Sequence, residues 1–339
     1  MGGAVNPAAL LAAALRDPAS VLALDPPGWT ALLAVARAEQ LIGTLAHRVQ
    51  GLAIPPAAAR VLEDARASAE QGRVAALWEA EMARRALAGI GIPVVLLKGT
   101  AYAAAGLAAG TGRSIGDLDI LVPRGRIGEA EAALLAAGWE WVKPDPYDDT
   151  YYRRWMHELP PLIHRERDRM IDVHHTILPL TARITPDADA LLADSVALGN
   201  GLGVLAPMDM ICHAAAHLFA DGDLAGGMRN LWDIHCLIGE FGTEGLEARA
   251  ARHGLASAVR RAARQANDLY GTPIPESWCV WDSVDPLYRR RLLARDGWGR
   301  PAHRFTRLGF YIRSHWLRMP PGLLVRHLWT KWRKAHVPG

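Results

Sequence analysis

Cysteine is scarce in this sequence of 339 residues, which contains only three. Cys212, Cys236 and Cys279 are far apart, and none of them belongs to a CxxC pair. This spacing excludes a disulfide framework and argues against a zinc site built from cysteines. The scarcity is typical of a protein that works in the reducing cytoplasm.

Long hydrophobic runs are missing as well. No stretch approaches the roughly 20 apolar residues that a helix needs to cross a bilayer. The first residues lack the cationic segment of a signal peptide, and Arg16 and Asp17 interrupt the apolar run near the start. We therefore expect a cytoplasmic protein without a transmembrane segment.

Acidic side chains are nearly absent from the C-terminal part of the chain. Thirteen arginines and lysines lie between Arg289 and Lys334, against one acid, Asp296, although the whole chain has a formal net charge of only +3. Such a basic segment can contact nucleic acid, an acidic partner or a membrane surface. More often it forms a solvated face whose aromatic side chains pack inward. The aromatic residues concerned here are Trp298, Phe305, Phe310, Tyr311, Trp316, Trp329 and Trp332.

Helical patterns dominate both ends of the chain. Hydrophobic residues make up 50% of the sequence, so a folded globular protein is expected. Alanine is abundant in the first third, and alanine favours helices. We predict helices near residues 8–16, 28–50 and 56–90, and again at 207–219, 228–240, 244–253, 255–270, 284–295, 301–317 and 321–335.

The middle of the chain alternates between short apolar runs and helical segments. We predict strands at 93–98, 118–122, 139–143, 160–165 and 169–175, with helices that begin at Gly99 and at residue 127. This series is typical of a small mixed sheet with flanking helices, so the expected fold class is α+β. We divide the chain into a helical N-terminal flank (1–90), an α/β core (91–200) and a helical C-terminal domain with a basic tail (201–339).

Two aspartates occupy one predicted strand, in the segment Asp117-Leu-Asp119-Ile-Leu-Val122. Residues two apart on a strand point to the same face, so both carboxylates should lie side by side. Adjacent carboxylates repel each other and lose hydration, and a divalent cation such as Mg²⁺ resolves that conflict. Because an Asp-x-Asp pair is common by chance, the interpretation needs support from other residues.

Three further segments provide this support. Gly99 and Thr100 follow a strand and open a helix, where backbone N–H groups favour a phosphate. Arg113 and Ser114 lie just before the aspartate pair and can add a cation and a hydroxyl. Asp172 places a third acid on a later apolar strand. Together these residue types indicate metal-assisted phosphoryl transfer.

These same segments carry a resemblance to a known family. The segment Leu97-Lys-Gly-Thr-Ala101, the pair Arg113-Ser114 and the segment from Asp117 to Val122 resemble bacterial proteins described as uncharacterised nucleotidyltransferases. The sequence is also similar to the nucleotidyltransferase toxins of abortive-infection systems, and both groups belong to the DNA polymerase β superfamily. The resemblance covers roughly residues 92–176.

The resemblance implies a polymerase β-like core and a reaction. A nucleoside monophosphate would pass from a nucleoside triphosphate, with ATP as the expected donor, to a hydroxyl of an acceptor, with release of pyrophosphate. The acceptor could be a small molecule, a peptide or protein, or an RNA end. Neither the acceptor nor the preferred base follows from the residues.

The resemblance also implies roles for individual residues. Asp117, Asp119 and Asp172 would bind the catalytic Mg²⁺ or Mn²⁺, and Asp172 would help to deprotonate the attacking hydroxyl. Gly99-Thr100 stands where the superfamily more commonly has Gly-Ser or Gly-Gly, which leaves the role of this turn less defined. The residues implied in nucleotide binding are Lys98, Gly99, Thr100, Arg113, Ser114, His174 and Arg229.

Histidines and one Arg/Asp pair give weaker signals. His213 and His217 are four apart on a predicted helix and share a face, but the glutamate of a metalloprotease motif is absent, which favours a packing role. Arg229 and Asp233 have the same spacing, so they form either a structural ion pair or a site in which Arg229 reaches the nucleotide phosphates. His174 shares a strand face with Asp172 and is either a site residue or a polar strand end.

Two alternative functions remain open at this point. A histidine-rich, metal-dependent phosphohydrolase could be built from His174, His213, His217, His235 and Asp233, although the contiguous His-Asp pair of such enzymes is absent. A non-catalytic nucleotide-binding or scaffold module is the other alternative. The three carboxylates argue against it, because a scaffold has no need of them.

Overall fold

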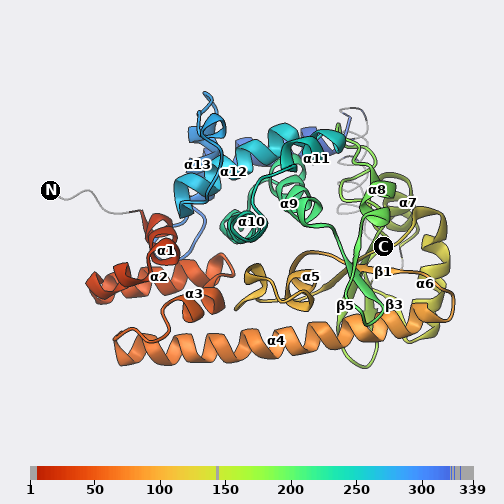
Figure 1. Cartoon of the computed structure of the whole chain (residues 1–339), viewed down its shortest axis with the longest axis horizontal. Helices are drawn as coiled ribbons and strands as arrows, with labels where there is room; N and C mark the ends of the chain where they lie inside the picture. The colour runs from red at the N-terminus through yellow and green to blue at the C-terminus, as the bar shows by residue number, and fades with distance from the viewer. Residues whose placement is uncertain (1–5, 143–144, 321, 323, 325–328, 330–339) are drawn as a thin grey trace.

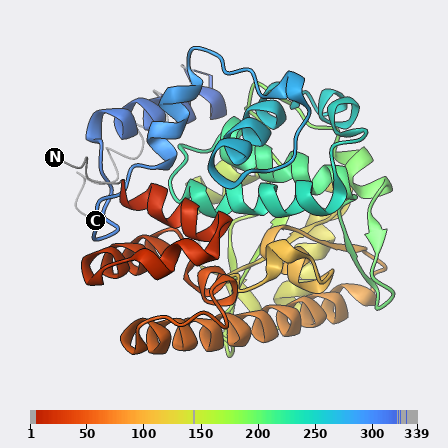
Figure 2. The same ribbon diagram turned by 60° about the vertical axis from the view of Figure 1, so that its left-hand side comes forward.

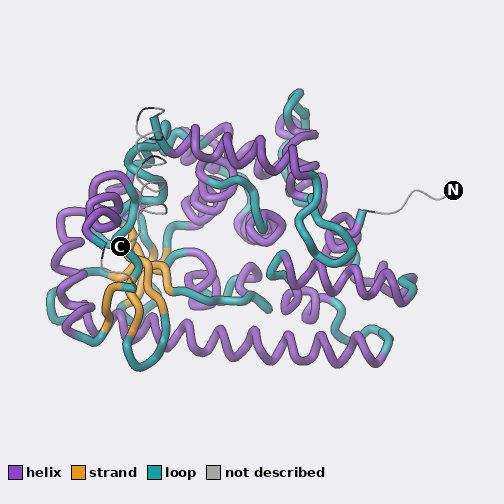
Figure 3. Tube along the Cα trace, turned by 180° about the vertical axis from the view of Figure 1, so that it is seen from behind, coloured by secondary structure: helices purple, strands orange, loops and turns teal. Residues whose placement is uncertain are grey.

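The structure is a computed structural model, and it describes residues 6–142, 145–320, 322, 324 and 329. Its helices surround a mixed sheet that lies at one end of the molecule (Figures 1 and 3). This arrangement has the α+β class and the flanking helices that the sequence predicts.

The N-terminal helices pack beside and above one long helix. α4 (Pro56–Ala88) contains 33 residues, begins with proline at its first position, and runs along one edge of the molecule beneath both α3 and the sheet (Figure 2). α1 (Pro7–Arg16), α2 (Pro26–Ala38) and α3 (Ile42–Arg48) precede it.

The single helix predicted at 28–50 is wrong, because the chain breaks between α2 and α3. Gln40 has a left-handed φ of 56°, which a continuous right-handed helix does not allow. Glu39, just before it, is buried and accepts hydrogen bonds from Arg295 and from the backbone N–H of Met228. The break is therefore supported by contacts with the C-terminal half of the chain.

The sheet has seven strands in the order β3-β4-β5-β2-β1-β7-β6. Parallel pairs join β2 to β5 and β1 to β7, and the other neighbours are antiparallel. β6 and β7 add two short strands that the sequence analysis does not predict. The strands are β1 (Val94–Leu96), β2 (Leu118–Leu121), β3 (Trp139–Trp141), β4 (Leu162–His164), β5 (Met170–His174), β6 (Val196–Ala197) and β7 (Leu202–Val204).

The remaining helices follow the predicted pattern closely, apart from two that were not predicted, α7 and α8. A π-helical turn, Ala216–Asp221, extends α9. The helix predicted at 321–335 falls mostly outside the described residues. The observed helices are α5 (Lys98–Ala104), α6 (Ile127–Ala136), α7 (Pro146–Trp155), α8 (Ala188–Ala193), α9 (Pro207–Ala215), α10 (Gly227–Phe241), α11 (Leu246–Arg252), α12 (Ala256–Tyr270), α13 (Asp285–Leu292) and α14 (Arg304–Arg318).

One continuous core joins the helices to the sheet. It runs from Leu11 on α1, through Leu96 and Ile120 in the sheet, to Ile234 on α10. α10 lies in the middle of the molecule and packs against α9 and α12 (Figure 1). Among the described residues, no helix combines the length and the apolar character that crossing a bilayer requires.

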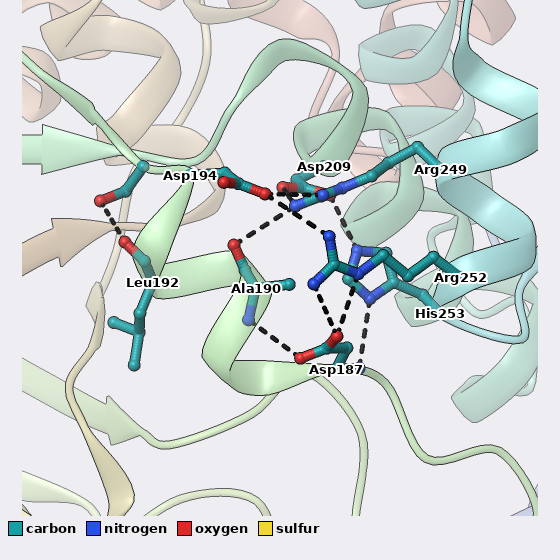
Figure 4. A network of polar contacts seen from close by, with 9 residues as sticks. Asp187, Ala190, Leu192, Asp194, Asp209, Arg249, Arg252 and His253 are labelled. Atoms are coloured by element: carbon teal, nitrogen blue, oxygen red, sulfur yellow. Dashed lines mark hydrogen bonds and ion pairs between the residues drawn. The ribbon is translucent and has the colours of Figure 1, made fainter.

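A buried polar network joins α8, α9 and α11 (Figure 4). Asp209 on α9 is fully buried and accepts hydrogen bonds from Arg249 and from His253, whose Nε2 atom lies 2.9 Å from Asp209 Oδ1. Arg249 also contacts Asp194, and the backbone N–H of Asp187 donates to His253 Nδ1. Every charged group at the centre of this network therefore has a partner of opposite charge or a hydrogen bond.

Most of the aromatic side chains in the basic C-terminal part point to solvent rather than inward. Phe310 is buried, and Trp332 lies outside the described residues. The inward packing expected of a solvated basic face therefore holds for Phe310 alone among those described. The exposed ones are Trp298, Phe305, Tyr311, Trp316 and Trp329.

Candidate active site

Three aspartates meet at the centre of the sheet. Asp119 on β2 is paired in register with Asp172 on the parallel neighbour β5, and Asp117 lies immediately before β2. One carboxylate oxygen from each lies within 4.8 Å of the oxygens from the other two. The alternation of side chains and the pairing of β2 with β5 thus bring together the three acids that the sequence singles out.

Asp119 is held by two neighbouring side chains. Its Oδ1 atom lies 2.6 Å from Lys98 Nζ and 2.9 Å from His174 Nε2, and the residue is only 3% exposed. Burial alone would raise the pKa of the Asp119 carboxyl, but the Lys98 ammonium and His174 outweigh it and hold that pKa well below its ordinary value. Asp119 is therefore ionised at neutral pH.

Lys98 takes an unusual backbone conformation to make this contact. Its φ of 49° lies in the left-handed region, which is uncommon for a residue other than glycine. Such strain persists where the surrounding structure fixes it, often at functional sites. Burial would lower the pKa of Lys98, but Asp119 outweighs burial and raises it, so the ammonium stays charged.

Asp172 is the least satisfied of the three acids. Its Oδ1 atom is buried and finds no hydrogen-bond partner among the described residues. Burial, together with the nearby carboxylates of Glu158 and Asp119, raises the pKa of Asp172 to about 7. A divalent cation fits this donor set, because it would supply the missing partner and offset the repulsion between the carboxylates.

A cavity of about 640 Å³ opens beside the aspartates. Its wall includes Asp117 and Asp119 together with five residues of the predicted nucleotide site: Lys98, Gly99, Arg113, Ser114 and Arg229. Asp172 does not line this cavity. Thr100 does not line it either, because α5 turns this side chain into the core, where it is 1% exposed and its hydroxyl is buried.

Gly99 is needed for the close approach of Arg113. A Cβ atom at position 99 would collide with the Nε atom of Arg113. The absence of a side chain lets the guanidinium lie across the start of α5, where Arg113 donates a hydrogen bond to Asp233 on α10. Glycine therefore serves here to position a cation on the cavity wall.

Arg229 forms an ion pair with Asp233, one of the two alternatives that the sequence spacing leaves open. Its NH2 atom lies 2.6 Å from Asp233 Oδ1, and its NH1 atom donates to Thr44 Oγ1 over 2.7 Å. Arg229 is 3% exposed, yet it also lines the cavity. The pair thus fixes the wall that faces Asp117 and Asp119.

The histidines of the alternative phosphohydrolase site are only partly brought together. His213 and His217 both line the cavity, and burial together with Lys98 lowers the pKa of His213 well below its ordinary value. His235 faces a different cavity and contacts Thr272. Because Asp233 binds Arg113 and Arg229, the five residues do not form one metal site.

Two residues near the triad escape the sequence analysis. His157 and Glu158 follow α7, and the backbone of Glu158 forms an antiparallel bridge with His174 at the end of β5. This pairing brings both side chains next to His174. A histidine followed by a glutamate in a short loop carries no recognisable spacing, so only the fold reveals the cluster.

A comparison with family models gives one match. The model of a family described as "uncharacterised nucleotidyltransferase" matches residues 25–271, which include both strands of the triad and the whole of α10. No curated protein and no solved structure matches the chain. Because the matched segment covers more than half of the sequence, the chain belongs to this nucleotidyltransferase family.

Proposed function

We propose that this protein transfers a nucleoside monophosphate from a nucleoside triphosphate to a hydroxyl of an acceptor and releases pyrophosphate. The observation that carries the proposal is the convergence of Asp117, Asp119 and Asp172 beside a cavity lined by cationic side chains. Membership of a nucleotidyltransferase family supports it. ATP is the proposed donor, and the cavity volume is within the range of small-molecule sites.

The three aspartates would hold Mg²⁺ or Mn²⁺. A divalent cation bound there would offset negative charge on the α-phosphate and on the departing pyrophosphate. In the transfer, the acceptor oxygen forms a bond to the α-phosphorus, and the bond from that phosphorus to the bridging oxygen of the β-phosphate breaks. The bonding electrons leave with the pyrophosphate.

Asp172 is suited to accept the proton of the attacking hydroxyl. Without a cation its pKa is about 7, and a bound cation would lower that value, so this carboxylate would be ionised at neutral pH and still more basic than Asp119. Asp119 cannot replace it, because Lys98 and His174 stabilise the ionised form of Asp119 and make it a weak base. Both paired aspartates would bind the cation, and Asp172 would in addition accept the proton.

Lys98 and Arg113 would bind the triphosphate. Both are cationic and line the cavity, and Ser114 adds a hydroxyl to the same wall. His174 would act through Asp119, since its Nε2 atom contacts that carboxylate. Arg229 would hold Arg113 in place through the shared partner Asp233. Thr100 has no part in the proposed contacts.

The acceptor is a hydroxyl compound from one of three classes: a small molecule, a peptide or protein, or an RNA end. The exposed aromatic and basic side chains of α13 and α14 offer a surface on which an acidic or nucleic-acid acceptor could bind. Arg289, Arg304 and Phe305 belong to this surface.

The test is transfer of label from an α-³²P nucleoside triphosphate in the presence of Mg²⁺. Pools of RNA, protein and metabolites serve as acceptors, and pyrophosphate release is followed in parallel. Replacing both Asp117→Ala and Asp119→Ala should lower transfer by on the order of a hundredfold or more. The matched control is Glu63→Ala with Asp64→Ala, which removes two exposed acids from α4. Equal transfer by the two double variants would refute the proposal.

A further inference from the structure

A cluster of two histidines and one glutamate lies behind the aspartate triad. His157 and Glu158 come from the loop after α7, and His174 ends β5. One ligand atom from each of the three lies within 4.8 Å of those from the other two. The cluster is separate from the cavity wall, since none of its members lines the cavity.

The backbone fixes the positions of these side chains. Glu158 and His174 stand opposite each other in an antiparallel bridge. The N–H of His175 donates to the carbonyl of His157 over 2.9 Å, and the N–H of Leu159 donates to the carbonyl of Val173 over the same distance. The loop is therefore attached to β5 as a short extra strand, which holds the three side chains in one place.

Hydrogen bonding determines which nitrogen of His174 is available. Asp119 Oδ1 accepts from Lys98 Nζ at 2.6 Å, and the same oxygen accepts from His174 Nε2 at 2.9 Å, so Nε2 carries the proton that it donates. In the neutral ring the lone pair then lies on Nδ1. This atom is buried and makes no hydrogen bond within the part of the chain that the structure describes, and the side chain is only 2% exposed.

Glu158 lies close to the free nitrogen of His174 and to His157. His174 Nδ1 lies 3.4 Å from Glu158 Oε2, and His157 Nε2 lies 3.8 Å from the same oxygen. Ligands of a tetrahedral zinc ion, at bond lengths of about 2.0–2.2 Å, are about 3.3–3.6 Å apart. The two distances to Glu158 are thus close to those of a metal site, and the two histidine nitrogens, which lie within 4.8 Å of each other, would move together on binding.

We propose that His157, Glu158 and His174 form a second metal centre that binds a first-row transition-metal ion, with Zn²⁺ as the best match. Nitrogen ligands suit zinc and its neighbours, whereas Mg²⁺ prefers oxygen ligands and near-octahedral geometry. Three protein ligands leave a fourth position open for water. The site is distinct from the aspartate triad, which offers oxygen ligands alone.

The two sites are connected through His174. A histidine that binds a metal through one nitrogen commonly donates the other N–H to a carboxylate, which fixes the ring and its tautomer. Here that carboxylate belongs to Asp119. An ion in the second centre would therefore hold the His174 ring in the orientation in which it positions Asp119.

The local charge favours a second cation. Glu158 adds a fourth carboxylate to Asp117, Asp119 and Asp172, and Lys98 is the cation in contact with Asp119. A divalent ion bound by His157, Glu158 and His174 would place positive charge beside these carboxylates without occupying the triad.

The experiment measures bound metal and uses no nucleotide, so its outcome is independent of the proposed transferase activity. The full-length protein is stripped with a chelator, equilibrated with Zn²⁺, desalted and analysed by inductively coupled plasma mass spectrometry. We expect about one equivalent of zinc per chain in the wild type. His157→Ala and Glu158→Gln should each reduce zinc affinity by roughly tenfold or more.

Two control variants distinguish zinc bound at this centre from zinc bound at the aspartate triad or at another histidine. Asp117→Asn removes a ligand of the triad, and His47→Gln removes a histidine that lies elsewhere, on α3. Both should retain about one equivalent of zinc. Equal zinc in all five proteins, or loss of zinc in Asp117→Asn alone, would overturn the proposal. Circular dichroism confirms that each variant is folded.

A measurement on the wild type alone keeps the proposal testable if the variants do not fold. Cobalt(II) replaces zinc and reports its coordination in the visible spectrum. We expect the intense absorption of a four-coordinate ion with nitrogen ligands, and it should persist in excess Mg²⁺. Only the weak absorption of a six-coordinate, all-oxygen ion would contradict the second centre.

Discussion

The side chains of Asp209 and Asp172 are both largely shielded from solvent, but hydrogen-bond donors surround Asp209 whereas other carboxylates lie next to Asp172. Asp209 on α9 is fully buried, but Arg249 and His253 donate to it. Burial would raise the pKa of Asp209, and those hydrogen bonds outweigh burial and lower it. Asp172 on β5 has other carboxylates as neighbours and an oxygen without a partner among the described residues, and its pKa is raised.

The difference separates a structural network from a binding site. The chain supplies Asp209 with the Arg249 guanidinium and a hydrogen bond from His253, so that network needs no ligand and ties three helices together (Figure 4). The triad has only Lys98 beside its three carboxylates, which costs stability and is the arrangement expected of a site that binds a cation. Replacing an acid in one region should therefore have the opposite effect on stability from replacing an acid in the other.

The largest effect on stability is expected at Asp209. Asp209→Ala leaves the buried His253 ring and the partly buried Arg249 side chain without the Asp209 acceptor, and Arg249 retains Asp194, so the cost should be about 3 kcal/mol, the lower end for a broken buried pair. Urea unfolding followed by circular dichroism measures the change. Asp194→Ala is the matched control, because Asp194 also contacts Arg249 but its side chain is 48% exposed, so its loss should cost less than about 1 kcal/mol. Equal costs for both variants would remove the structural role given to Asp209.

A smaller effect of opposite sign, dependent on pH, is expected at Asp172. The pKa of Asp172 is about 7 in the folded protein, against an ordinary value of 3.8. Between these two pH values the folded protein keeps the proton on Asp172, whereas the unfolded chain has released it, so a rise in pH favours the unfolded state. The metal-free wild type should therefore lose stability across this range and recover none of it at higher pH. The difference of about three pKa units sets an upper limit of about 4 kcal/mol on this loss, and screening by solvent reduces the expected loss to about 2 kcal/mol.

Asp172→Asn should remove this loss. Asparagine resembles the protonated acid, so we expect the variant's advantage in free energy of unfolding, measured in chelator, to increase from pH 5 to pH 7. At pH 8 the variant should be the more stable of the two, and added Mg²⁺ should stabilise the wild type alone. A difference between the two proteins that does not change with pH would contradict the charge repulsion inferred at the triad.

The smallest effect is expected at Gly99. Gly99→Ala forces Arg113 away from the start of α5, and such overpacking costs about 1 kcal/mol or more. We expect the affinity for a non-hydrolysable ATP analogue, measured by calorimetry, to fall about fivefold. Gly116→Ala is the control, since Gly116 also lines the cavity but a Cβ there meets nothing within 4 Å. Unchanged affinity in Gly99→Ala would show that Arg113 does not bind the nucleotide.

The sequence predicts the elements of the triad because local rules suffice for them. Alternation along a strand places Asp117 and Asp119 together, and the apolar neighbours of Asp172 mark its strand. The register that pairs Asp119 with Asp172 depends on tertiary contacts, which no spacing in the sequence encodes. The same is true of β6 and β7, which are two and three residues long and are defined by pairing with β1.

Side-chain direction and long-range contacts explain the other places where the structure differs from the sequence-based predictions. The sequence places Thr100 at the start of a helix but does not show that α5 turns its hydroxyl into the core. It places Glu39 in a helix, whereas a contact with Arg295, more than 250 residues away, accompanies the break at Gln40. Glu158 joins the site only because its loop pairs with β5.

The most direct test of the central claim is cation binding by the aspartate triad itself. Mn²⁺ is titrated into the protein with a non-hydrolysable ATP analogue, and free Mn²⁺ is read from its electron paramagnetic resonance signal. Glu158→Gln is present throughout, so that the histidine centre contributes little. We expect a saturable loss of the free signal that Asp172→Asn weakens by roughly tenfold or more. Equal Mn²⁺ binding with and without the Asp172 carboxylate would contradict a cation site formed by these three acids.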